Sequence, residues 1–76
     1  MIDLMSPTPL YVQLADLLAG RIADGDLAPR QPLPSESTLQ QEYGVSRGTV
    51  RAAMALLRER GLVVTIPQRG TYVAES

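Results

Sequence analysis

The stretch EYGVSRGTVRAAM, residues 42–54, has the composition of a tight turn that leads into a helix. Gly44 is the residue type that most often follows the end of a helix, and Ser46 is a preferred N-cap for a new one. From there, apolar residues recur at positions 50, 53, 54 and 57, which is the spacing of one buried helix face. A second helix over about 36–43, with Ser35 as its N-cap, precedes the turn. Two helices joined in this way predict a helix-turn-helix.

The N-terminal part of the chain predicts one more helix, over about 9–24. Thr8 and Pro9 have the pattern of an N-cap followed by proline at the first helical position. Leucine and isoleucine then form one stripe from Leu10 to Ile22, and Gly25 is expected to end the helix. The proline-rich segment DLAPRQPLP that follows must be extended or turning, with room for a very short strand around residues 31–33.

The C-terminal part predicts a hairpin. The third helix is expected over about 47–60, and Gly61 stops it. Residues 62–66 alternate as in a strand, PQRG fits a turn, and residues 71–74 return as a second strand. The expected fold class is therefore mainly α with a small β-wing: a winged helix-turn-helix of three helices and a C-terminal β-hairpin, forming a single DNA-binding domain over residues 1–76.

Composition excludes several classes of function. The chain has no cysteine and no histidine, which removes thiolate zinc sites and the commonest general base. Its carboxylates are not grouped for acid–base work; Glu36 and Glu42, for example, fall on different faces of their helix. No apolar run is long enough to span a bilayer, and the N-terminus does not resemble a signal peptide. We therefore expect a cytoplasmic protein that is not an enzyme and has no metal, no cofactor and no membrane partner.

The charge is unevenly distributed along the chain, although its sequence pI is near 5.1. Residues 1–42 contain two arginines and six carboxylates, whereas residues 43–74 contain five arginines and one glutamate. On the third helix, Arg47, Arg51 and Arg58 fall within about 40° of one another and roughly a right angle from the buried face. An arginine stripe is often only a solvated face. Here the stripe follows a helix-turn-helix turn, and the backbone N–H groups after Ser46 can bind phosphate. Arg69 at the hairpin tip adds another cation. These signals together favour DNA binding.

The sequence LPSESTLQQEYGVSRGTVRAAMALLRERGLVVTIPQRGTYV, residues 33–73, resembles the DNA-binding domain of the GntR family of bacterial transcriptional regulators. The motifs that carry the resemblance are LPSE, GVSR.TVR.A, L...GL and RGTYV. The resemblance implies a winged helix-turn-helix and transcriptional control, as a repressor, by a homodimer on a palindromic operator in double-stranded DNA. It matches Arg47 and Arg51 to DNA contacts and Gly70 to a wing glycine at the minor groove. The predicted DNA-binding residues are Ser35, Ser46, Arg47, Gly48, Thr49, Arg51, Gln68, Arg69 and Gly70.

The chain departs from the family pattern at four positions. Ser37 stands where an arginine is usual, Gln40 where alanine is usual, and Arg30 and Gln68 where glycine is common. Family members normally continue into a C-terminal domain that binds a metabolite and dimerises. We therefore expect a domain of a longer regulator, with a short stand-alone member as the alternative, and a small-molecule effector only if such a further domain exists.

A different class of function is also open at this point. Winged helices serve in protein–protein contact as well, and fold does not fix function. A module of that kind would present apolar anchors on its third helix. This sequence presents Arg47, Arg51 and Arg58 there instead.

Overall fold

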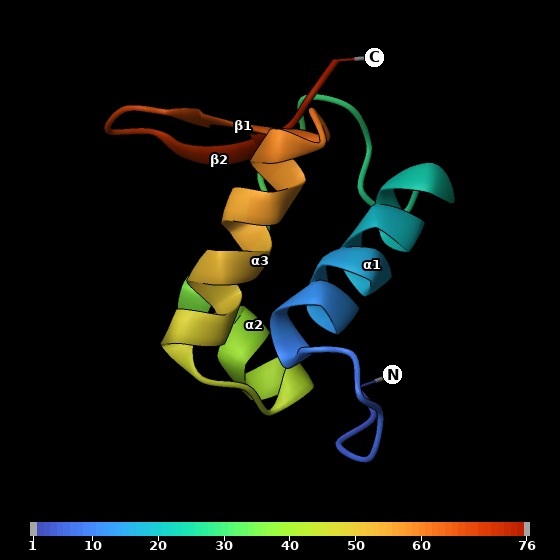
Figure 1. The fold of residues 1–76 in the computed structure, drawn as a ribbon. Helices are drawn as coiled ribbons and strands as arrows, with labels where there is room; N and C mark the ends of the chain where they lie inside the picture. Colours follow the sequence, from blue (N-terminus) through green and yellow to red (C-terminus); the bar gives the residue numbers. More distant parts are fainter. Residues whose placement is uncertain (1, 76) are drawn as a thin grey trace.

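Three helices and a two-stranded hairpin follow one another in the computed structural model, which describes residues 2–75 (Figure 1). The helices are α1 (Leu10–Ala23), α2 (Glu36–Tyr43) and α3 (Arg47–Glu59), and the antiparallel strands are β1 (Val63–Ile66) and β2 (Gly70–Val73). The fold class predicted from the sequence is confirmed. Each helix lies within one residue of its expected bounds at either end. The expected 1–76 domain extends one residue beyond the described residues at each terminus.

The ends of α2 and α3 form as their local sequence predicts. The Ser35 hydroxyl accepts a hydrogen bond from the Thr38 N–H at 3.1 Å, and the Ser46 hydroxyl accepts one from the Thr49 N–H at 3.1 Å. Gly44 takes a left-handed conformation with φ of 66°, and its N–H donates to the carbonyl of Gln40. These caps satisfy backbone groups that no intrahelical bond can reach, so the chain turns sharply between the two helices.

The start of α1 differs from the expectation. The N-cap is Pro9 rather than Thr8, and no side chain caps the helix. Pro9 is extended, with ψ of 146°, so the first helical residue is Leu10. The Gln13 side chain stabilises this end of the helix instead. Its amide donates to the carbonyls of Thr8 at 2.8 Å and Asp3 at 3.0 Å. A side chain four residues into the helix thus fixes the entry of the chain.

The core lies between α1 and α3, with α2 and the first residue of the wing closing it. On α3 the buried residues are the four that periodicity predicts, at positions 50, 53, 54 and 57. On α1 the predicted stripe is only partly buried: Leu14 and Leu18 are fully buried, whereas Leu10, Leu17 and Ile22 are half-buried. α1 and α3 lie side by side (Figure 1), and this packing leaves the opposite side of α3 uncovered.

The wing projects from the end of α3 and is joined to the segment before α2. Val63 is 2% exposed and anchors β1 to the core, whereas Val64 is 46% exposed on the opposite face. A β-bridge pairs Pro32 with Tyr72 of β2, and the Leu33 N–H donates to the Thr71 carbonyl at 2.9 Å. This isolated bridge lies where the sequence leaves room for a very short strand, around residues 31–33, but the segment forms no strand of its own. It ties the entry of α2 to the wing, so the helix-turn-helix and the wing are held in a fixed arrangement.

Two tight turns, one before α2 and one at the wing tip, each hold a residue other than glycine in a left-handed conformation. Ala28–Gln31 and Ile66–Arg69 each close with a hydrogen bond from the last N–H to the first carbonyl, at 3.0 Å. Both carry proline at the second position, and the third residues, Arg30 and Gln68, have φ of 69° and 65°. This is the geometry of a type II turn, which favours glycine at the third position. The left-handed backbone is retained here by residues with a Cβ, at a cost in strain.

Relieving that strain at the wing tip is expected to stabilise the protein. Gln68→Gly should raise the free energy of unfolding by about 0.5–1 kcal/mol, because the left-handed penalty exceeds the extra backbone entropy of glycine. Gln41→Gly, the same change at an exposed position within α2, should lower it by about 1 kcal/mol. Urea denaturation followed by circular dichroism would measure both. A Gln68→Gly protein that is as destabilised as Gln41→Gly would show that the turn carries no such strain.

Candidate nucleic-acid interface

The uncovered side of α3 presents the predicted reading arginines. Arg47 and Arg51 lie one turn apart at the N-terminal end of the helix, and both side chains are exposed. Their position follows from the sequence, because packing of Val50, Ala53 and Met54 against the core turns the arginine stripe outward. The N-terminal residues of a recognition helix are those that reach base edges in helix-turn-helix proteins.

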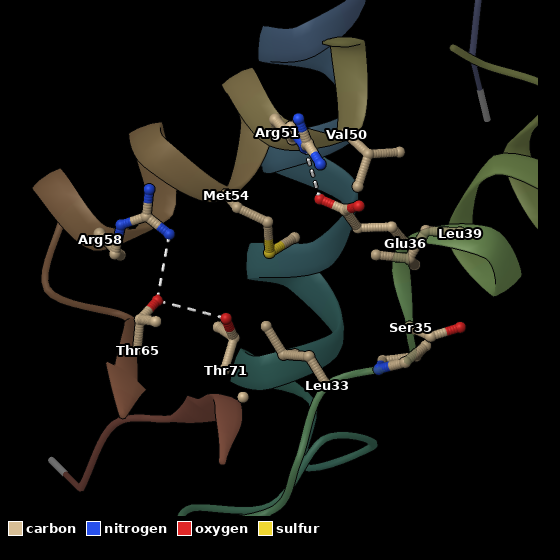
Figure 2. A pocket seen from close by; sticks show the side chains of 12 residues that line it. Leu33, Ser35, Glu36, Leu39, Val50, Arg51, Met54, Arg58, Thr65 and Thr71 are labelled. Atoms are coloured by element: carbon tan, nitrogen blue, oxygen red, sulfur yellow. Dashed lines mark hydrogen bonds and ion pairs between the residues drawn. The ribbon is translucent and has the colours of Figure 1, made fainter. Parts of the chain in front are cut away.

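Glu36, the first residue of α2, contacts both arginines. Its Oε2 accepts a hydrogen bond from Arg51 Nε at 2.9 Å (Figure 2), and its Oε1 lies 3.9 Å from Arg47 Nε. The hydrogen bond from Arg51 is the main cause of a lowered pKa of the Glu36 carboxyl, and it raises the pKa of Arg51. Sequence reasoning treated Glu36 only as a favourable charge at the start of a helix. The structure places it as the counter-ion of Arg47 and Arg51.

The carboxyl of Glu36 is therefore expected to titrate below its ordinary value of 4.5. Because its pKa is depressed in the folded protein, the ion pair is complete above the unfolded pKa and is lost as pH falls through the folded one. Arg51→Ala should raise the midpoint of Glu36. Arg47→Ala should raise it less, since that contact is longer. Carboxyl-carbon NMR titration of the three proteins would measure the midpoints, and an unchanged value in Arg51→Ala would contradict the assignment.

The first turn of α3 offers donors to an anion. The N–H groups of Arg47 and Gly48 have no hydrogen-bond partner in residues 2–75, whereas the N–H of Thr49 is already bonded to Ser46. Gly48 keeps the approach open: a Cβ there would meet only the Ser46 hydroxyl, at 3.8 Å. Such N–H groups at the positive end of a helix dipole suit a phosphate. Ser35 caps the neighbouring α2, and its exposed hydroxyl also bonds Thr38 Oγ1 at 2.9 Å.

The predicted wing residues lie together at the hairpin tip, away from the helical core (Figure 1). Gln68, Arg69 and Gly70 are all exposed. The Tyr72 hydroxyl donates to the Arg69 carbonyl at 3.1 Å, which braces the turn from within β2. The nine predicted residues therefore form two groups on the structure, one made of the start of α2 and the first turns of α3 and one at the tip of the wing.

The arginines differ in whether a carboxylate neutralises them. Arg21 pairs with Asp26 and Glu42. Arg30 pairs with Glu75, and Arg60 pairs with Asp16. Arg47 and Arg51 share Glu36. Within residues 2–75, only Arg58 and Arg69 have no carboxylate at ion-pairing distance. Both lie where α3 meets the wing or on the wing itself, so uncompensated positive charge is concentrated on this side despite the low pI.

Comparison with known proteins identifies the family. The family model described as "Bacterial regulatory proteins, gntR family" matches residues 10–73. The chain belongs to the GntR family. This confirms the resemblance seen in the motifs of residues 33–73, and the GntR assignment covers all three helices and both strands.

GntR relatives and structures agree with this assignment. The mannosyl-D-glycerate transport/metabolism system repressor MngR of Escherichia coli is 49% identical over 71 residues, which are 93% of this chain and 30% of MngR. The structure of YtrA from Sulfolobus acidocaldarius, a GntR-family transcription factor, superposes with a TM-score of 0.90 at 38% identity, covering 100% of this chain and 80% of that one. The AraR DNA-binding domain, in a crystal structure with operator ORX1, gives a TM-score of 0.87 at 33% identity, covering 97% of this chain and 95% of that one.

This GntR chain thus contains a DNA-binding domain of a transcription regulator. Its relatives are regulators and not enzymes, as the composition led us to expect. The chain spans about 30% of the length of the curated relatives it matches. Among the described residues, no helix combines the length and the apolar character that crossing a bilayer requires.

Proposed function

We propose that this GntR domain, residues 1–76, reads a specific sequence in double-stranded DNA and serves a cytoplasmic repressor that binds a palindromic operator as a homodimer. The observation that carries the proposal is the exposed pair Arg47 and Arg51 at the start of α3. Similarity to an AraR domain crystallised with its operator supports it. An arginine can recognise guanine through two hydrogen bonds in the major groove, which gives sequence discrimination.

The remaining predicted residues have distinct roles in this proposal. The N–H groups of Arg47 and Gly48 and the hydroxyls of Ser46, Thr49 and Ser35 bind backbone phosphates on either side of the reading helix. Gln68, Arg69 and Gly70 enter or flank the adjacent minor groove. Glu36 restrains Arg51 before binding through their 2.9 Å hydrogen bond, so that fewer side-chain conformations must be lost when bases are contacted. An effector, if one acts, binds in a part of a longer regulator beyond this domain.

Dimerisation follows from the energetics of a small interface. Single DNA-binding modules of this size bury limited surface, and the chain has few arginines available for phosphate. One domain alone is therefore expected to bind weakly. Two domains held on a palindrome combine their affinities through a high effective concentration.

Selection from a random duplex library would test the proposal, using the domain alone and the domain fused to a dimeric coiled coil. The winning duplex would then be titrated by fluorescence anisotropy at two salt concentrations. Enrichment of a palindrome by the fused protein supports a dimeric sequence reader, and the half-site spacing gives its geometry. A folded, dimeric fusion that enriches no sequence would refute sequence-specific reading and leave protein–protein contact as the function of this winged helix.

A further inference from the structure

A hollow of about 480 Å³ opens between α3, the entry of α2 and the wing (Figure 2). Its floor is apolar and includes Leu33 and Met54. Its rim is polar: Glu36 and Arg51 stand at one end, and Arg58 stands with two wing threonines at the other. The first end contains the ion pair of Glu36 and Arg51 that is described above. The second end has no role in the predicted set of DNA-binding residues.

At that second end, three side chains from α3, β1 and β2 form a chain of hydrogen bonds. Arg58 Nη1 donates to Thr65 Oγ1 at 3.1 Å, and Thr65 Oγ1 lies 3.2 Å from Thr71 Oγ1. Thr65 and Thr71 face each other directly in the register of β1 and β2. The last turn of α3 is thus tied to the middle of the wing. Arg58 has five guanidinium N–H donors, and the bond to Thr65 uses one of them. Of the two threonine hydroxyl protons, one is used within the pair and the other is available to a further acceptor.

The tethered guanidinium is a positive charge without a counter-ion in the part of the chain that the structure describes. No carboxylate of residues 2–75 lies within ion-pairing distance of Arg58, in contrast to Arg60 two residues later, which pairs with Asp16 at 2.9 Å. An exposed arginine that is ordered by hydroxyls and lacks a counter-ion is suited to an anion. Its four remaining donors and the threonine hydroxyl match the oxygen-rich, singly charged phosphodiester group.

We propose that Arg58, together with the hydroxyls of Thr65 and Thr71, forms a phosphate site that binds the DNA backbone where it passes between α3 and the wing. This inference rests on the proposed function. Arg58 follows Arg51 by seven residues, which is roughly 10 Å along the helix. A helix that reads bases at its N-terminal end leaves the groove toward its C-terminal end, where backbone contacts are the ones available. The site would therefore fix how deeply α3 sits, while Arg47 and Arg51 read sequence.

Removing the positive charge from either Arg58 or Arg60 distinguishes a specific phosphate contact from a general effect of net charge on DNA binding. Arg58→Gln is compared with Arg60→Gln, which changes net charge equally on the same helix end. If Arg58 neutralises one phosphate, the slope of log K against log[salt] should fall in magnitude by roughly 0.9, and operator affinity should fall roughly five- to tenfold. Arg60→Gln should keep the parental slope. Thermal unfolding of both variants shows whether each is folded under the assay conditions.

Neutral substitutions in the DNA backbone locate the contacted phosphate. Duplexes with one neutral methylphosphonate at each backbone position are titrated with the parent protein and with Arg58→Gln. At one backbone position, the methylphosphonate is expected to weaken binding by the parent but not to weaken binding by Arg58→Gln any further. Thr65→Val, which removes the tether but keeps the charge, should weaken binding with an unchanged salt slope.

The outcomes distinguish this inference from the function on which it rests. If Arg58→Gln behaves as Arg60→Gln does, and no methylphosphonate position loses its effect, Arg58 does not bind the backbone. In that case the function proposed above stands so long as Arg47→Ala loses discrimination at one base pair of the operator. If the dimeric parent selects no operator at all, the proposed function fails, and the phosphate site fails with it.

Discussion

Arg47→Ala is expected to weaken binding to the selected operator by roughly 5- to 150-fold, which corresponds to about 1–3 kcal/mol. Arg47 is exposed at the first position of α3, where a recognition helix reaches base edges. Its contact with Glu36 is long, at 3.9 Å, so little must be broken before it engages DNA. Anisotropy titration of the operator with parent and variant would measure the loss.

The pattern of the loss matters as much as its size. If Arg47 reads a base, binding to a duplex changed at that one base pair should be weakened in the parent and should scarcely weaken further in Arg47→Ala. Arg60→Ala serves as the control, because Arg60 pairs with Asp16 of α1 on the other side of the helix. A uniform loss across all duplexes would mean that Arg47 binds phosphate. No loss at all would move the reading face elsewhere.

Features with local causes could be predicted from the sequence. The caps at Ser35 and Ser46 and the turn at Gly44 depend on residues within four positions of each other, and all three are found. The buried face of α3 follows from helical periodicity alone. The exposed position of the arginine stripe is then a geometric consequence. This is why the arrangement of α3 was predictable even though the overall charge argued against DNA binding.

Contacts between distant residues could not be predicted in this way. Glu36 and Arg51 are 15 residues apart, and only the crossing of α2 over α3 brings them to 2.9 Å. For β1, alternation predicts two faces but not which one is buried, and the core takes Val63 while Val64 is exposed. The contact between Thr65 and Thr71 was missed as well, because the observed register centres on Gln68, whereas a turn over residues 67–70 would pair Thr71 with Ile66.

The positions that depart from the GntR pattern show what the backbone requires. Arg30 and Gln68 keep the left-handed conformation that glycine adopts easily, so the turns persist although the favoured residue is absent. At Ser37, in the first turn of α2, a short hydroxyl replaces a long cation on an exposed position. Gln40 is half-buried. Since the fold accommodates all four residues, we expect the change at Ser37 to alter DNA affinity rather than folding.

Leu57→Ala is expected to lower the free energy of unfolding by roughly 2–5 kcal/mol, because truncating a buried leucine removes apolar burial and leaves a cavity. Leu57 is 0% exposed, and it lies on α3 between α1 and the start of the wing. For a domain of this size the total stability is on the order of 4–11 kcal/mol, so the change would consume a large part of it.

Leu4→Ala is the matched control for Leu57→Ala, since the same side chain is truncated at a position that is 78% exposed. It should change stability by less than about 0.5 kcal/mol. Urea denaturation of the three proteins, followed by circular dichroism, would compare them. Equal stabilities for Leu57→Ala and Leu4→Ala would mean that α3 is not anchored through Leu57. A large loss confined to Leu57→Ala would show that α3 is anchored to the core through Leu57, and this packing is what turns Arg47 and Arg51 outward in the folded protein.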